Sequence, residues 1–145
     1  SAWNNIEGAS RLSDVDGAGG VSAYEADQVA QNGGMYGGWG GGSYYCTTGD
    51  YDIATAYLYS GYPTRVVIVW DQNPWYANYT TLPSADLDLI IFDPAMVSVT
   101  GSYSWDNTYE IAEFTPATTG TYTIRVDQVR CDANPKYIGF AWSSP

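Results

Sequence analysis

The sequence predicts a mainly β protein, an antiparallel β-sandwich of the jelly-roll kind with a short helical segment before it. From residue 43 onward, short runs rich in β-branched and aromatic residues are separated by Gly, Pro, Asp and Asn, as in an all-β domain. The 145 residues suit one domain with its own core. Charged residues make up only 14% of the chain, a composition common in extracellular β-proteins.

The N-terminal part, residues 1–32, contains the single helix that we expect, at residues 22–31. Ser22 and Glu25 have the spacing of a capping box, in which each side chain bonds a free backbone N–H at the helix start. Asn32 and two glycines follow, and glycine just past a helix usually ends it.

Residues 33–43 hold seven of the 16 glycines and are interpreted as a linker. The segment also contains Met35, Tyr36 and Trp39, whose apolar surface would favour contact with a neighbour. We therefore expect a linker that lies against the β-domain.

Residues 44–145 are expected to form the β-domain. In residues 121–127 the alternation is regular, with Tyr122, Ile124 and Val126 on one face and polar side chains on the other. Short strands without helices between them favour antiparallel pairing. The expected strands are residues 51–59, 65–71, 86–92, 96–103, 108–114, 121–130 and 136–142.

Cys46 and Cys131 are the only cysteines. The low charge and the lack of a Cys-x-x-Cys motif favour a disulfide over two free thiols. Such a bond closes a long loop and contributes on the order of 4 kcal/mol in the chain-entropy model. We expect a secreted, extracellular protein, and because Ser1 stands without Met or a visible signal peptide, we expect an N-terminal portion to have been removed.

The net charge of −11 comes from 16 acidic and 5 basic residues. Such a chain repels nucleic-acid phosphates and anionic membranes, so neither is an expected partner. No apolar run approaches the roughly 18 residues of a membrane-spanning helix. The same negative charge attracts divalent cations.

The lack of histidine limits the catalysis that this chain could perform. Ser-His-Asp and Cys-His sites are excluded, and no G-x-S-x-G motif or glycine-rich phosphate loop is present. Catalysis by two carboxylates, as in glycosidases, is not excluded by the composition, but nothing in the sequence singles out a pair. No catalytic residue is therefore assigned.

Asp86 and Asp88 form the strongest candidate for a metal site. Alternation places both carboxylates on one face of a strand, where two like charges are costly unless a cation neutralises them. Calcium takes six to eight oxygen ligands, and Asp71 and Asp106 (or Asn107 beside it) are possible further ligands. The alternative is that both carboxylates accept backbone N–H bonds where a loop meets the strand.

Trp75, Tyr76 and Tyr79 are candidates for binding a ligand because they lie in the expected loop at residues 72–85. Flat rings match the faces of sugars, so the loop could form a carbohydrate-binding platform. The alternative is that these rings pack in the core or against the loop.

Several runs of the chain together resemble a known family. RVVIVWDQNP (65–74), LPSADLDLIIFDP (82–94), TGSYSWDNTYEIAEFTPATTGTYTIRV (100–126) and YIGFAW (137–142) are similar, in order and spacing, to the β-rich domain that follows the catalytic domain of secreted subtilisin-like serine peptidases. The run EGASRLSDVDGAGGVSAYEADQVA (7–30) resembles the end of that catalytic domain.

The resemblance implies a non-catalytic, jelly-roll-like accessory domain that stabilises the peptidase and is often calcium-binding. The expected partner is then a subtilisin-like catalytic domain, from the same precursor or a separate chain, with a protein or polysaccharide substrate. The family's catalytic segments are absent from this chain. Two other functions stay open, a carbohydrate-binding module and a structural or adhesion domain.

Overall fold

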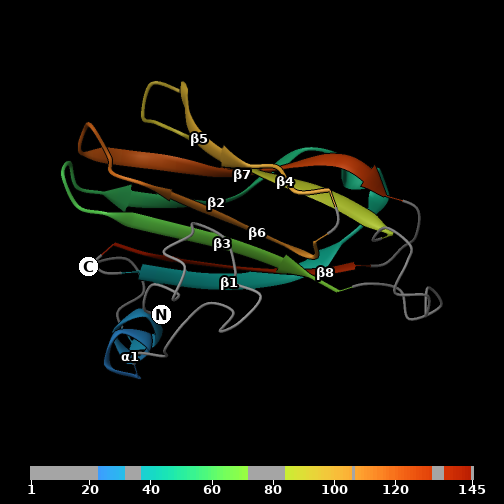
Figure 1. Cartoon of the computed structure of the whole chain (residues 1–145), viewed down its shortest axis with the longest axis horizontal. Coiled ribbons are helices and arrows are strands. Elements are labelled where there is room, and N and C mark those ends of the chain that lie inside the picture. Colours follow the sequence, from blue (N-terminus) through green and yellow to red (C-terminus); the bar gives the residue numbers. More distant parts are fainter. Residues whose placement is uncertain (1–22, 32–36, 72–83, 106, 132–135, 145) are drawn as a thin grey trace.

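The computed structural model describes residues 23–31, 37–71, 84–105, 107–131 and 136–144 (Figure 1). The elements among these residues are α1 (Ala23–Gln31), β1 (Gly37–Tyr44), the 3-10 turn η1 (Cys46–Thr48), β2 (Tyr51–Leu58), β3 (Thr64–Trp70), β4 (Ala85–Phe92), β5 (Ser98–Ser102), β6 (Tyr109–Phe114), β7 (Gly120–Cys131) and β8 (Lys136–Ser143).

The strands form two four-stranded antiparallel sheets. The first has the order β1-β8-β3-β6 and the second the order β2-β7-β4-β5. The pairs β4–β5, β3–β6, β2–β7 and β1–β8 are nested within one another along the chain and fall alternately into the two sheets. This nesting is the connectivity of an eight-stranded jelly roll, so the expected fold class is confirmed.

The two sheets share one hydrophobic core. In β4, Leu87, Leu89 and Ile91 are fully buried, and alternate residues of β7 in the same sheet and of β3 in the other sheet are buried as well. The fully or nearly fully buried apolar side chains are Tyr44, Ala56, Leu58, Val66, Ile68, Trp70, Ala85, Leu87, Leu89, Ile91, Ala112, Tyr122, Ile124, Val126, Ile138 and Trp142.

A buried carboxylate joins the two sheets at the β5 and β6 edges. Glu110 of β6 is only 1% exposed and faces inward, opposite Ile68. It accepts a hydrogen bond from the Ser102 hydroxyl at the end of β5 and one of 2.8 Å from the Ser104 backbone N–H. Because Ser102 ends β5 and Ser104 follows it directly in the chain, Glu110 links the β6 edge of one sheet to the β5 edge of the other.

All the strands expected from residue 51 onward are present within a few residues of their predicted limits, and the helix is confirmed at Ala23–Gln31. The segment interpreted as a glycine-rich linker differs from expectation, because its residues 37–43 belong to β1 and pair with β8. Added Cβ atoms at Gly38 and Gly40 would come within 2.5 Å of Trp142 and 2.8 Å of Phe140. The glycines therefore let the rings of β8 lie against the β1 backbone.

Replacing Glu110 with Ala should lower the free energy of unfolding by about 3 kcal/mol. The change removes charge-assisted hydrogen bonds and leaves the Ser104 N–H without its acceptor. Glu110→Gln keeps one acceptor and should cost less. Urea denaturation measures both, with Glu113→Ala as the control because Glu113 is exposed and pairs with Arg65, so its loss should cost under about 1 kcal/mol. Equal losses for the variants at 110 and 113 would contradict the role of Glu110.

Candidate functional site

The outer face of the β2-β7-β4-β5 sheet carries the chemistry that stands out in this molecule. Because the inward residues of β4 are buried, Asp86, Asp88, Ile90 and Phe92 point away from the core. The register with β7 places Asp88 directly opposite Asp127, and Asp86 opposite Arg130. By strand alternation, Asp86 and Asp88 therefore share this face.

We call Asp86, Asp88 and Asp127 the acidic cluster. Asp86 is only 2% exposed, and among the described residues its Oδ1 atom has no hydrogen-bond partner. Burial raises the pKa of the Asp86 carboxyl, and the Arg130 charge partly opposes that shift. An unsatisfied carboxylate oxygen at this depth costs free energy that a cation would recover.

Asp88 is the half-buried and most strongly shifted member of the cluster. Burial, followed by repulsion from Asp86, Glu110 and Asp127, raises its pKa to about 6. Burial, then the charge of Asp50, also raises the pKa of Asp127, although Arg125 opposes this. Two carboxylates directly opposite each other on adjacent strands repel. Other interactions in the fold must therefore offset this repulsion.

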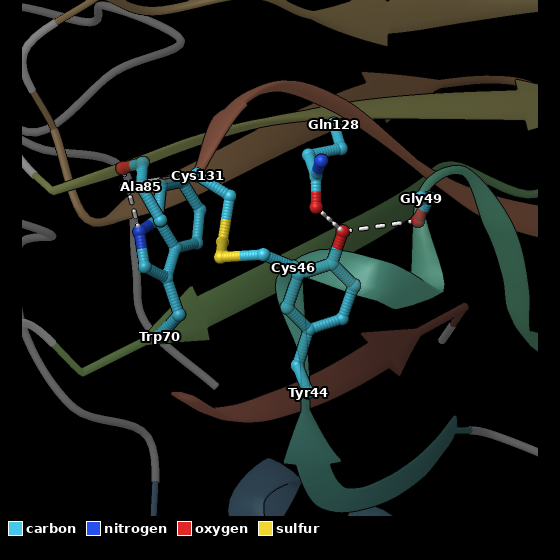
Figure 2. Close-up of a disulfide and its surroundings, with 7 residues drawn as sticks. All are labelled: Tyr44, Cys46, Gly49, Trp70, Ala85, Gln128 and Cys131. Atoms are coloured by element: carbon cyan, nitrogen blue, oxygen red, sulfur yellow. Dashed lines mark hydrogen bonds between the residues drawn. A yellow bond between two sulfur atoms is a disulfide. The ribbon is translucent and has the colours of Figure 1, made fainter. Parts of the chain in front are cut away.

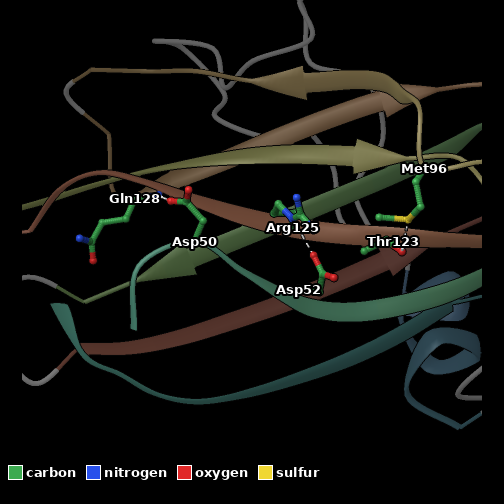
Figure 3. Close-up of polar contacts among 6 residues, drawn as sticks. All are labelled: Asp50, Asp52, Met96, Thr123, Arg125 and Gln128. Atoms are coloured by element: carbon green, nitrogen blue, oxygen red, sulfur yellow. Dashed lines mark hydrogen bonds and ion pairs between the residues drawn. The ribbon is translucent and has the colours of Figure 1, made fainter. Parts of the chain in front are cut away.

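Arg125 lies on the same face but is already engaged by other groups. Its Nε donates to Asp52 Oδ1 at 2.7 Å (Figure 3). Its guanidinium also lies 4.8 Å from the centroid of the Phe92 ring. Figure 3 also shows Asp50, whose Oδ1 accepts a 2.8 Å bond from the Gln128 backbone N–H. The arginine therefore reduces the negative charge of the cluster without neutralising it.

A disulfide fixes the end of the sheet where the acidic cluster lies (Figure 2). Cys46 in η1 bonds Cys131, which pairs with Ala85 at the start of β4, so the predicted disulfide is confirmed. The Trp70 indole N–H donates to the Ala85 carbonyl at 3.2 Å. These contacts fix the backbone directly before Asp86.

Tyr44 supports the same end from inside the core. Its hydroxyl lies 2.9 Å from the Gly49 carbonyl and 2.6 Å from Gln128 Oε1. Burial, then the nearby Tyr51 and Asp50, raises the pKa of Tyr44 to about 12. The phenol therefore stays protonated and remains a hydrogen-bond donor at physiological pH.

Three exposed tyrosines gather at the opposite end of this face, and we call them the tyrosine cluster. Tyr57 and Tyr59 have ring centroids 5.5 Å apart, and Tyr59 and Tyr62 have centroids 6.5 Å apart, both edge to face. The loop that carries them is tied down, because the Ser60 N–H donates to Thr119 and the Gly61 N–H to the Pro116 carbonyl. The cluster is thus exposed and held in place.

The residues expected to complete a calcium site beside Asp86 and Asp88 are Asp71 and Asp106. Asp71 follows β3 in the other sheet, and its Oδ1 accepts a 2.6 Å bond from the Tyr137 N–H. Asp106 lies outside the described residues, as do Trp75, Tyr76 and Tyr79. Across the described part of the chain, no three His, Cys, Asp or Glu side chains gather so as to hold a metal ion.

Sequence reasoning missed Asp127 and the tyrosine cluster as parts of this face. The alternation of residues 121–127 already grouped Arg125 with Asp127, but it did not show which strand lay alongside. The sequence places Tyr57 and Tyr59 in a strand but does not show which way that strand faces, because the pairing of β2 with β7 cannot be read from either segment alone.

Comparisons with known proteins identify no family. No family model matches the chain, and no curated protein matches it. One similar solved structure is that of Aeromonas hydrophila PliG, described as a periplasmic lysozyme inhibitor of g-type lysozyme. It is 14% identical, with a TM-score of 0.47, and the match covers 77% of this chain and 89% of PliG.

These findings correct the family interpretation. The resemblance to the C-terminal region of subtilisin-like serine peptidases is wrong, since neither a peptidase family model nor any curated protein matches the chain. The accessory-domain function and the catalytic-domain partner are withdrawn with it, together with the protein or polysaccharide substrate. The carbohydrate-binding and structural or adhesion alternatives gain no support either.

The disulfide indicates an extracytoplasmic location, because such bonds form and persist in oxidising compartments. Within the described residues, no helix is long and apolar enough to cross a membrane.

Because of Asp88, the protein should be more stable at mildly acidic pH than at neutral pH. Its pKa is 3.8 as a free side chain and about 6 when folded, so between these values the folded state binds more protons. The free energy of unfolding therefore falls as pH rises from about 4 to 6 and stays lowered above that. The raised pKa values of Asp86 and Asp127 act in the same direction.

Asp88→Asn should recover on the order of 1 kcal/mol at pH about 7.5 after allowance for solvent screening, and much less at pH about 4. Thermal unfolding across this pH range measures the effect. Glu113→Gln is the control, because it removes one negative charge from the other sheet. If the stability of Asp88→Asn depended on pH as that of the wild type does, this account of Asp88 would be contradicted.

Proposed function

We propose that this chain is a secreted binding protein whose acidic cluster receives a basic side chain of a protein partner. The observation that carries the proposal is the unbalanced negative charge at Asp86 and Asp88. One oxygen of Asp86 lacks a partner among the described residues while Asp88 has a pKa near 6. Perturbed groups of this kind are concentrated at functional sites.

The accessible member of the cluster is Asp88. Asp86 is almost fully buried, so it contributes mainly to the negative potential, whereas Asp88 is half-buried and can meet an incoming group. A guanidinium or ammonium group would bond the Asp88 carboxylate and lower the repulsion from Asp127 opposite it. The net charge of −11 would speed the approach of a basic partner.

The tyrosine cluster is suited to complete such an interface. Tyr57 lies opposite Thr121 on the same sheet, toward the other end from Asp88. Tyrosine is enriched in protein interfaces because its ring buries area at low entropic cost and its hydroxyl still bonds polar groups. Rings held edge to face lose little further freedom on binding.

Calorimetric titration with an oligo-arginine peptide, an oligo-glutamate peptide of equal length and a g-type lysozyme tests the proposal. We expect binding of a basic probe that Asp88→Asn weakens by about tenfold and that weakens as salt increases. Glu113→Gln removes the same charge elsewhere and should change affinity by less than about twofold. Equal effects of the two substitutions, or equal binding of oligo-glutamate, would overturn it.

Calcium at Asp86 and Asp88 stays a prediction with its own test. The unpartnered Asp86 oxygen and the adjacent Asp88 would supply two ligands, and carbonyls and waters would have to supply the rest. A chelator should then lower the melting temperature, added calcium should restore it, and Asp88→Ala should abolish the response. An unchanged melting curve in chelator would instead favour the basic side chain as the natural counter-charge.

A further inference from the structure

The two sheets leave four edge strands, β1, β6, β2 and β5, and the described residues of three of them carry devices that discourage pairing with another chain. β2 has a bulge between Asp52 and Ala54. β5 is five residues long, and its pairing with β4 is also interrupted by a register shift. β6 directs the buried Glu110 inward and exposes Glu113.

β1 has none of these features in its described residues. Its eight residues pair with β8 in an uninterrupted register from Gly37 to Tyr44. The run GGWGGGSY contains no charge and no proline, in a chain that carries 16 acidic residues. A long, uninterrupted and uncharged edge of this kind is a template for strand addition.

The helix covers only the start of this edge. Val29 of α1 approaches Gly37, where an added Cβ atom would lie 2.6 Å from Val29 Cγ2. Figure 1 shows α1 beside the beginning of β1, with the strand continuing past it. An added Cβ at Gly42 would meet nothing within 4 Å, so packing inside the described part of the chain does not explain that glycine.

We propose that β1 pairs antiparallel with β1 of a second copy of this chain, joining two four-stranded sheets into one of eight strands. A second copy fits because an antiparallel pair of identical strands is self-complementary about a two-fold axis. The neutral strand also brings no like charges together at the seam, whereas a charged partner strand would find no counter-charge in β1.

One register uses the exposed rings beside the edge. With the axis at Gly40, Trp39 of each copy lies opposite Gly41 of the other, on the outer face of the sheet. Trp39 is 67% exposed and Tyr137, whose hydroxyl would lie 2.9 Å from a Cβ at Gly41, is 57% exposed. The Trp39 ring of one copy would then cover the Gly41 and Tyr137 surface of the other.

Sedimentation velocity of the full chain over a wide range of concentrations tests the proposal. The wild type should shift from monomer to dimer as concentration increases. Trp39→Lys places two positive charges beside the axis and removes the ring, and it should weaken the dimer by at least about tenfold. Val99→Lys makes the matched change on β5, at a residue that is 44% exposed, and should leave the dimer unchanged.

Hydrogen exchange provides a second measurement that does not depend on either variant folding. The amides of residues 38–43 in the wild type should become more protected as the concentration rises. A wild type that stays monomeric, equal dimerisation of the two lysine variants, or protection of β1 that does not change with concentration would each overturn the proposal.

Discussion

The alternation of β4 is the constraint on which the fold and the binding face both depend. Leu87, Leu89 and Ile91 have no exposed surface, so each contributes the full hydrophobic gain of a core side chain. Their burial leaves Asp86 and Asp88 no position except the outer face, because a shift of one residue would exchange the two sets. The acidic cluster is held in place by the burial of the leucines and isoleucine, although its own charges repel.

The few basic residues near this face do not neutralise its negative charge. Arg125 is held by Asp52 and the Phe92 ring, and Arg130 opposes only part of the shift in Asp86. Burial is the largest cause of the raised pKa values of these three carboxyls, and repulsion from neighbouring carboxylates adds to it at Asp88 and Asp127. A binding site for a cationic group needs such an imbalance, since a fully paired surface would first have to break its own contacts.

Much of the fold could be predicted from the sequence because its signals are local. Alternation and turn residues located the strands from residue 51 onward, and the chain's two cysteines gave the disulfide. β1 could not be predicted in this way, since glycine has no side chain to alternate and low strand propensity. Its strand forms because the rings of Trp142 and Phe140 on β8 lie against glycines 38 and 40, a contact visible only across strands.

Only part of the candidate site could be predicted, because contacts between strands cannot be read from one segment of the sequence. Asp86 and Asp88 share a strand, so their common face followed from a period of two. Asp127 joined them through the β4–β7 register, which depends on a bulge between Asp86 and Leu87. The family interpretation failed because runs of alternating residues separated by Pro, Gly and Asp reflect a shared architecture, and architecture does not specify activity.

The two proposed surfaces lie on different sheets and can therefore act independently. β1 is an edge of the β1-β8-β3-β6 sheet, while Asp88 lies on the outer face of the other sheet. Pairing at β1 would extend the first sheet without covering the second sheet's outer face. A dimer would then present two acidic faces, and a multivalent basic partner would bind it more tightly than a monomer through effective concentration. Such avidity should disappear in Trp39→Lys while single-site binding at Asp88 persists, which separates the dimer from the binding face by experiment.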